Sequence, residues 1–227
     1  MTYLSIVIPT MNEEGSIGLV IDEIRKCVPA SLDYEMLVVD TNSKDRTREI
    51  AASKGARIID EPRRGYGRAY KTGFEKAEGQ VIATLDADMT YPADRIPGLV
   101  KILDDGKYDF ITTNRFAELQ PGAMSFTHRL GNRILAIATR ILFRVKLRDS
   151  QSGMWVFRKS LLGKIDLSSD GMSMSEELKV EAFKKAKSLE VPIRYSPRVG
   201  EVKLNTWRDG KNNLKFLFKK RFGSTKN

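Results

Sequence analysis

The sequence predicts an α/β protein with a mainly parallel sheet and helices on both of its faces. Three observations support this fold class. Short apolar runs of strand length alternate with segments of helical spacing, glycine or proline follows each helical segment, and the connections are short. This alternation is typical of parallel sheets, because a strand needs a crossover helix before the next parallel strand can begin.

The first half of the chain contains five predicted strands and four predicted helices. The strands cover Leu4–Ile8, Met36–Val39, Ala56–Ile59, Val81–Leu85 and Phe110–Thr112. The helices are an apolar stripe of Ile17, Val20, Ile21 and Ile24 closed by Pro29, then Asp45–Lys54, Tyr66–Ala77 and Ile96–Leu103. Ligands bind at the carboxyl ends of the strands in such sheets, so the polar residues after each strand are the candidates for a site.

The second half predicts fewer strands and longer helices. Its elements are a helix over Phe126–Leu142, a strand over Met154–Phe157, a helix over Ser175–Ser188, strands over Val191–Tyr195 and Val199–Leu204, and a basic helix over Asn212–Phe222. No internal repeat and no linker between two domains is visible in the sequence.

The composition is that of a globular protein. Among 227 residues, 41% are hydrophobic and 30% charged, which excludes a disordered or collagen-like chain. No run approaches the roughly 18 apolar residues of a membrane-spanning helix, and we expect no secretion signal. The one cysteine, Cys27, has no partner for an internal disulfide, so a reducing cytosol is the expected compartment.

The net charge of +10 is distributed unevenly. Residues 198–227 contain nine basic and two acidic residues, and Ala123–Arg148 contains six basic residues and no acid. Such blocks indicate an anionic partner: nucleic acid, a phosphorylated ligand or an anionic membrane face, the alternative being a solvated helix face. Aromatic and basic residues do not alternate as in single-strand readers, so we expect no nucleic-acid partner.

Two carboxylates follow the fourth predicted strand directly. Asp86 and Asp88 come after the apolar run Val81–Leu85 with one alanine between them. Two carboxylates at this spacing can hold one hard divalent cation, which bridges the diphosphate of a nucleotide. The alternative is a turn that caps the next helix.

Two further strand ends carry weaker signals. Asp40 ends the second strand, where a carboxylate can accept hydrogen bonds from a base or ribose. Arg63 and Arg64 precede Gly65-Tyr66-Gly67, which opens a helix and either faces phosphates or forms a plain turn. The glycine fingerprint of dinucleotide-binding folds and the P-loop are both absent from the sequence.

Motifs from both halves of the chain occur in a characteristic order. The first half contains Pro9-Thr10-Met11-Asn12-Glu13, Asp40 with Ser43, Asp45 and Thr47, Arg64–Ala69 and Asp86-Ala87-Asp88. These motifs resemble a family 2 glycosyltransferase of GT-A fold, which has a Rossmann-like sheet. The second half contains Thr113–Phe116, His128–Asn132, Arg148–Gly153 and Arg198–Leu204. These motifs are similar to the dolichol-phosphate mannose synthase branch, whose members move a sugar from a nucleotide donor to a polyprenyl phosphate. The resemblance covers about residues 3–208.

The resemblance also implies roles for individual residues. The nucleotide-sugar donor would be bound by Pro9, Thr10, Glu13, Asp40, Ser43, Arg64, Gly67 and Asp86. Mg²⁺ or Mn²⁺ would be held by Asp86 and Asp88. The acceptor phosphate would be bound by Arg115, Arg129, Arg198 and Lys203. The implied catalytic set is Asp86, Asp88, Asp149 and Arg115, with Glu177 near the sugar.

Three positions depart from the family pattern. Thr41 stands where a second aspartate often follows Asp40, Thr90 stands where the mannose enzymes often have a metal-binding glutamine, and Arg133 lies near the place of an acceptor-binding serine. These departures count against GDP-mannose as the donor. The sequence does not identify the sugar, the UDP- or GDP-linked donor, the prenyl chain or the oligomeric state.

The expected chemistry needs no catalytic triad. A phosphate monoester is already anionic near neutral pH, so it requires positioning and charge shielding rather than a base. We therefore expect a metal-dependent transfer with inversion at the anomeric carbon. The alternative is a family 2 enzyme that acts on a soluble phosphorylated acceptor.

A lipid acceptor would explain the positive charge of the C-terminal segment. We expect a glycosyltransferase domain over residues 1–208 and a basic amphipathic segment over 209–227. That segment places Leu214, Leu217, Phe218 and Phe222 on one face beside lysines. Such a helix lies in the interface of an anionic membrane, here the cytosolic leaflet, which predicts a peripheral protein. The alternative is a helix that packs its apolar face on the domain.

Overall fold

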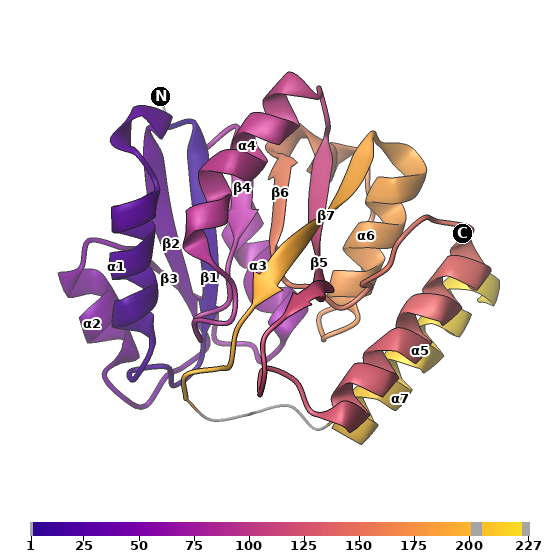
Figure 1. Ribbon diagram of the computed structural model, residues 1–227. Coiled ribbons are helices and arrows are strands. Elements are labelled where there is room, and N and C mark those ends of the chain that lie inside the picture. The colour runs from indigo at the N-terminus through magenta and orange to yellow at the C-terminus, as the bar shows by residue number, and fades with distance from the viewer. Residues whose placement is uncertain (1, 201–205, 224–227) are drawn as a thin grey trace.

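The computed structural model describes residues 2–200 and 206–223 and contains one seven-stranded sheet (Figure 1). The strands lie in the order β3-β2-β1-β4-β6-β5-β7, and β6 alone is antiparallel to its neighbours. The predicted mainly parallel sheet is thereby confirmed. The strands are β1 (Leu4–Thr10), β2 (Tyr34–Asp40), β3 (Arg57–Asp60), β4 (Val81–Thr84), β5 (Phe110–Leu119), β6 (Trp155–Arg158) and β7 (Ser188–Tyr195).

Helices cover both faces of the sheet, as the sequence predicts. One face carries α1 (Ile17–Cys27), α2 (Thr47–Ser53) and α4 (Ile96–Asp105), and the other carries α3 (Tyr66–Lys76) and α6 (Met174–Lys185). The stripe of α1, for example, is buried against the sheet through Ile17, Val20, Ile21 and Ile24. Because β1 and β4 bury side chains on both faces, they read as continuous apolar runs in the sequence.

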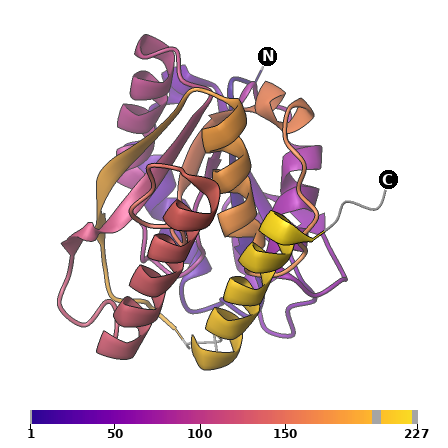
Figure 2. The ribbon, with the colours of Figure 1, turned by 90° about the vertical axis from the view of Figure 1, so that its right-hand side faces the viewer.

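Two further helices, α5 (Phe126–Phe143) and α7 (Thr206–Phe222), lie side by side beyond the β5 side of the sheet (Figures 1 and 2). A third apolar cluster joins them to α6 and to the segment that follows α5. Its buried members are Leu135, Phe143, Val145, Leu147, Val180 and Leu217. The described part of α7 is therefore attached to the body of the protein through Leu217, the packing that the sequence left as an alternative.

The structure differs from the sequence-based elements mainly after residue 170. The helix predicted over Ser175–Ser188 ends at Lys185, and β7 begins at Ser188. The strand predicted over Val199–Leu204 is wrong in its described part, because Gly200 has a φ of +99° and the Val199 amide donates to the Asp88 carbonyl instead of pairing in the sheet. The rest of that strand, with Lys203, lies outside the described residues.

The C-terminal helix is longer than predicted. It begins at Thr206 instead of Asn212, so it starts three residues before the expected boundary at 209. Among residues 2–200 and 206–223, no helix is both long and apolar enough to cross a membrane.

Candidate active site

A cleft of about 380 Å³ lies where the parallel strands end, between these strand ends and helices α5 and α7. The residues that the sequence predicted for the site and that line this cleft are Pro9, Thr10, Glu13, Arg64, Asp86, Asp88, Arg115 and Arg198. They come from five separate segments of the chain. The fold thus brings both predicted sides, donor and acceptor, to one cavity.

The carboxylates after β4 line the cleft, with Asp88 buried and Asp86 half-buried. Asp86 Oδ1 accepts hydrogen bonds from the hydroxyls of Tyr66 (3.3 Å) and Tyr70 (3.2 Å), both on α3. Burial, and next the charge of Asp88, raise the pKa of Asp86. Asp88 accepts hydrogen bonds from the amide (3.1 Å) and hydroxyl (2.6 Å) of Thr90. Met89 makes this turn possible by adopting a left-handed φ of +64°.

Arg198 connects the two carboxylate-bearing strand ends. Its guanidinium lies 2.9 Å from Glu13 Oε1 and 3.4 Å from Asp88 Oδ2, and these carboxylates follow β1 and β4. Within residues 2–200 and 206–223, the Arg198 Nε atom is buried and has no hydrogen-bond partner. A buried donor without a partner is costly, so a hydrogen-bond acceptor that reached this atom would be stabilising.

Arg115 is held in the cleft by Asp149. The guanidinium donates through two nitrogens to the two oxygens of Asp149 (2.7 and 2.9 Å), and the Arg115 amide donates to Oδ2 (3.0 Å). Burial tends to raise the pKa of Asp149, but the Arg115 charge keeps it below its ordinary value. Asp149 is fully buried and does not line the cleft, so it orients Arg115 and does not itself reach a substrate. Arg115 and Asp149 thus form one unit, of which only Arg115 lines the cleft.

Asp40 and Ser43 lie behind the donor side of the cleft. Asp40 is buried and accepts hydrogen bonds from the Thr10 hydroxyl (3.0 Å) and the Ser43 amide (3.0 Å). The Ser43 hydroxyl in turn accepts from the Asn12 amide (2.8 Å). Neither residue lines the cleft, whereas Thr41 does. From this position, Asp40 and Ser43 hold in place the residues after β1, which form one wall of the cleft.

The turn before α3 contributes Arg64 and Gly65 to the cleft, but not Gly67. A Cβ at Gly67 would lie 2.5 Å from the Met174 Cβ and 2.9 Å from two carbonyl oxygens. Glycine is therefore required there for α3 to approach α6. Gly67 thus has a packing role in the structure. It does not line the cleft, so no direct contact supports the donor-binding role implied for it.

Helix α6 supports the loop that carries Asp149 and Gln151. Lys179 is fully buried, and its Nζ donates to the carbonyls of Ser150 (2.9 Å) and Ser152 (2.5 Å). Burial lowers the pKa of Lys179, while burial raises that of the neighbouring Glu176. Gln151 reaches the cleft and accepts a hydrogen bond from Asn213 of α7 (3.0 Å).

Three implied residues lie elsewhere. Arg129 is exposed on α5 and does not line the cleft, although its neighbour His128 does. Glu177 is buried away from the cleft, where it accepts from the Ser169 amide (2.8 Å) and from Lys220 (2.9 Å). It ties α7 to α6 instead of facing a sugar, which corrects the expectation for Glu177. Lys203 lies outside the described residues.

Several cleft residues were assigned no individual role from the sequence. The main ones are Tyr66, Tyr91, His128, Gln151, Tyr195 and Asn213. Tyr66 and Tyr70 are four residues apart on a predicted helix, so the sequence is enough to place them on one face of it. The sequence does not show that this face contacts Asp86. Burial, followed by the charge of Arg115, lowers the pKa of His128, which favours the neutral imidazole near neutral pH.

The donor atoms around Asp86 and Asp88 fit a hard divalent cation. Asp88 is buried and Asp86 is half-buried, and a cation between them would relieve the mutual repulsion of the two carboxylates. The described residues contain no cluster of three histidine, cysteine or acidic side chains that could hold a metal. A cation bound here would therefore take its other ligands from the donor diphosphate and water.

Comparison with known proteins identifies the family. The family model described as glycosyl transferase family 2 matches residues 5–166. The chain is 37% identical over 219 residues to the low-salt glycan biosynthesis hexosyltransferase Agl6 of Haloferax volcanii, covering 94% of this chain and 52% of that protein. It is 34% identical over 210 residues to a dolichyl-phosphate hexose transferase of the same organism, covering 91% and 89% of the two chains. The chain thus spans about half the length of the first of these relatives and most of the second.

The fold is also that of solved glycosyltransferases. Glucosyl-3-phosphoglycerate synthase from Mycobacterium tuberculosis, in complex with Mn²⁺, UDP and glucosyl-3-phosphoglycerate, matches with a TM-score of 0.79 at 22% identity. The match covers 98% of this chain and 80% of that one. The expected fold is thereby confirmed, and with the family model matching well over half of its residues the chain belongs to glycosyl transferase family 2.

Proposed function

We propose that this chain transfers a hexose or N-acetylhexosamine from a nucleoside diphosphate sugar to the phosphate of a polyprenyl phosphate. The product would be a lipid-linked sugar for glycoconjugate assembly. The observation that carries the proposal is that one cleft contains both the carboxylates Asp86 and Asp88 and the guanidinium groups of Arg115 and Arg198. The names of the Haloferax relatives support the polyprenyl acceptor.

The donor would bind over the ends of β1, β2 and β4. Asp86 and Asp88 would hold Mg²⁺ or Mn²⁺, which supplies positive charge to the departing nucleoside diphosphate. Thr10 and Thr41, ordered by Asp40, would line the nucleotide side, and Arg64 would face its phosphates. Because UDP and a divalent metal are bound in the structural relative, UDP is the first donor base to test.

The acceptor phosphate would bind on the opposite side. Arg115, fixed by Asp149, would bind it through its remaining donors, and Arg198 would offer its unpartnered Nε. Arg129, exposed beside His128, would meet the phosphate at the cleft entrance. An acceptor oxygen forms a bond to the anomeric carbon as the bond from that carbon to the diphosphate oxygen breaks, which inverts the centre. No base is required, because the nucleophile is already an anion.

A soluble phosphorylated acceptor is the second candidate, since the structural relative acts on phosphoglycerate according to its description. The same two arginines would bind such a phosphate. A specific observation favours the lipid: α5, which forms one wall of the cleft, exposes large apolar side chains to solvent.

The test is a transfer assay with radiolabelled UDP- and GDP-sugars, offered in parallel to a short-chain polyprenyl phosphate and to 3-phosphoglycerate. We expect label in the prenyl product, loss of transfer in EDTA, and loss of at least about 100-fold in turnover for Asp88→Ala. Asp105→Ala removes an exposed carboxylate on α4 and serves as the matched control, with activity within about twofold. Label in phosphoglycerate alone, or full activity of Asp88→Ala in EDTA, would refute the proposal.

A further inference from the structure

Helix α5 has an apolar stripe that nothing described in the structure covers. Five large apolar side chains on it are 49% to 80% exposed: Phe126, Leu130, Ile134, Ile137 and Ile141. At about 100° per residue they fall within an arc of about 80° on the helix. The buried residues of the same helix, among them Leu135 and Thr139, lie on the opposite side. The stripe is therefore not part of the core, and it is far larger than scattered exposed residues.

A row of arginines borders this stripe on one side. Arg129, Arg133 and Arg140 occupy the adjoining arc of about 60° on α5, and all three are exposed. No acidic residue occurs between positions 123 and 148. A second copy of this helix would thus bring arginines and no counter-charge, which disfavours pairing of the stripe with itself.

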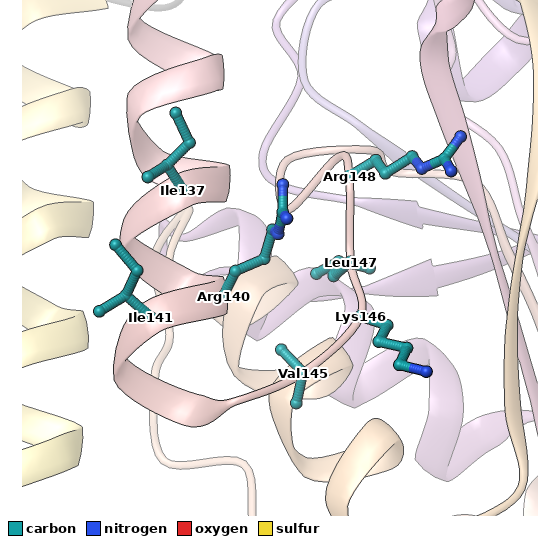
Figure 3. A pocket seen from close by; sticks show the side chains of 7 residues that line it. All are labelled: Ile137, Arg140, Ile141, Val145, Lys146, Leu147 and Arg148. Atoms are coloured by element: carbon teal, nitrogen blue, oxygen red, sulfur yellow. The ribbon is translucent and has the colours of Figure 1, made fainter.

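Two adjoining hollows, of about 620 and 450 Å³, lie beside the arginine row. The larger lies between α5 and the segment that follows it, and the smaller lies between α5 and the part of β5 that contains Asn114, Phe116 and Ala117. Both are lined by Ile137, Arg140 and Arg148, and the larger is also lined by Lys146 and Leu147. Figure 3 shows Arg140 extending from α5 toward the segment that follows the helix, and Arg148 on that segment with its guanidinium pointing away from the helix. The side chains of Ile137 and Ile141 project from the other side of the helix (Figure 3).

The basic side chains of this region have no counter-charge of their own. Arg140, Lys146 and Arg148 are exposed, and none forms an ion pair with a carboxylate in residues 2–200 or 206–223. Unpaired guanidinium groups over an apolar floor match the phosphodiester of an anionic phospholipid, whose acyl chains begin beside the headgroup. The neighbouring stripe matches the acyl boundary itself.

We propose that the outer face of α5 with residues 145–148 docks the protein on an anionic phospholipid leaflet, with phospholipid headgroups bound between Arg140, Lys146 and Arg148. This inference rests on the proposed lipid acceptor and specifies how the enzyme reaches it. The inner face of the same helix lines the cleft through His128, Asn132 and Leu135. One helix thus places the cleft directly above the leaflet that holds the acceptor.

Helix α7 takes a secondary part in this arrangement. The sequence favoured it as the membrane-binding element, but Leu217 is fully buried and Lys220 is paired with Glu177 and Glu181. Phe218 and Phe222 remain exposed beside Lys215 and Lys219. We therefore expect charges on α7 to matter less than those beside α5.

The test is co-sedimentation of the full chain with phosphatidylcholine vesicles that contain 30% phosphatidylglycerol or none. Arg140→Gln/Lys146→Gln should weaken binding to the anionic vesicles by roughly 10- to 30-fold and leave binding to neutral vesicles unchanged. Ile134→Ser/Ile141→Ser should weaken binding to both. The matched controls, each also removing two positive charges, are Arg25→Gln/Lys26→Gln on α1 and Lys215→Gln/Lys219→Gln on α7; each should change binding less than threefold.

Equal losses for the Arg140/Lys146 and Arg25/Lys26 pairs would overturn the inference, as would a larger loss for the α7 pair. A stripe variant that turns a dimer into a monomer without changing vesicle binding would assign the stripe to a second copy instead. Turnover of a water-soluble ten-carbon prenyl phosphate separates the two proposals. If the protein turns over this substrate but does not bind vesicles, the docking face is refuted and the proposed transfer stands. If it binds vesicles but transfers sugar to no prenyl phosphate, the proposed transfer is refuted and the docking face stands.

Discussion

Residues of one chemical type play different parts at the strand ends, and their partners decide which. Asp40 accepts hydrogen bonds from several donors and orders a wall of the cleft, Asp86 accepts hydrogen bonds from two tyrosines, and Asp149 is paired with an arginine. The sequence identifies these carboxylates, because they follow apolar runs. It does not reveal their partners: Arg115 and Asp149 lie 34 positions apart, and only the antiparallel insertion of β6 next to β5 brings them together.

Glu61 offers a pH-dependent prediction at this scale. It accepts hydrogen bonds from Arg63 (2.7 and 2.8 Å) and from the Thr72 hydroxyl (2.5 Å), next to the turn that carries Arg64. The Arg63 hydrogen bonds, chiefly, lower the pKa of Glu61 from 4.5 to about 2. Its stabilisation is therefore complete above pH 4.5 and is lost as the pH falls toward 2.

We expect Glu61→Gln to lower the free energy of unfolding by about 1–2 kcal/mol at pH 7, because Arg63 is largely exposed and solvent screens the pair. The difference between the two proteins should shrink steadily from pH 5 to pH 3. Urea unfolding at a series of pH values measures it. A difference that stayed constant with pH would show that the carboxylate charge is not the cause.

Among the helices and strands, those with a regular periodic pattern could be predicted from the sequence, whereas the boundary between α6 and β7 could not. Strands buried on both faces and amphipathic helices have strong periodic patterns, so β1, β4 and α1 match their predictions closely. The boundary between α6 and β7 was missed, because a helix buried all round has little amphipathic pattern. Even the charged residues Glu176, Glu177 and Lys179 of α6 are buried.

The attachment of α7 gives a prediction for this scale. Leu217 is fully buried between α5, α6 and α7, whereas its neighbour Phe218 is 48% exposed. We expect Leu217→Ala to destabilise the protein by about 2–4 kcal/mol, and the larger truncation Phe218→Ala to cost less than about 1 kcal/mol. Thermal or urea unfolding of the two variants decides the matter. Equal effects would mean that α7 is not packed through Leu217.

For the whole molecule, the sequence predicts the sheet and the edge at which ligands bind, but it does not predict the contacts that form the far wall of the cleft. The alternation of strands and helices in the sequence places Thr10, Asp86 and Asp88 on one edge of the sheet. The far wall is made by contacts such as Gln151 with Asn213, 62 positions apart. Side-chain contacts at such separations leave no periodic pattern in a single sequence.

Donor binding should stabilise this whole arrangement by mass action. With Mg²⁺ or Mn²⁺ present, the correct nucleoside diphosphate at 100 times its Kd should add about 2.7 kcal/mol, or about 5–10 °C in Tm. Comparing UDP with GDP in a thermal unfolding assay identifies the donor base. The shift should fall sharply in EDTA and in Asp88→Asn. A shift of equal size without metal would contradict binding through the carboxylate pair.

The ion pair between Arg198 and Glu13 has a consequence for the making of the protein. Its partners are 185 positions apart, so at roughly 5–20 residues per second Arg198 leaves the ribosome about 10–40 seconds after Glu13. From the time that Asp88 has been made until Arg198 follows, the nascent chain contains Glu13, Asp86 and Asp88 without the guanidinium that contacts Glu13 and Asp88. The strand ends can thus fold before this ion pair can form. The cleft is completed only after the segment that contains Arg198 has been made.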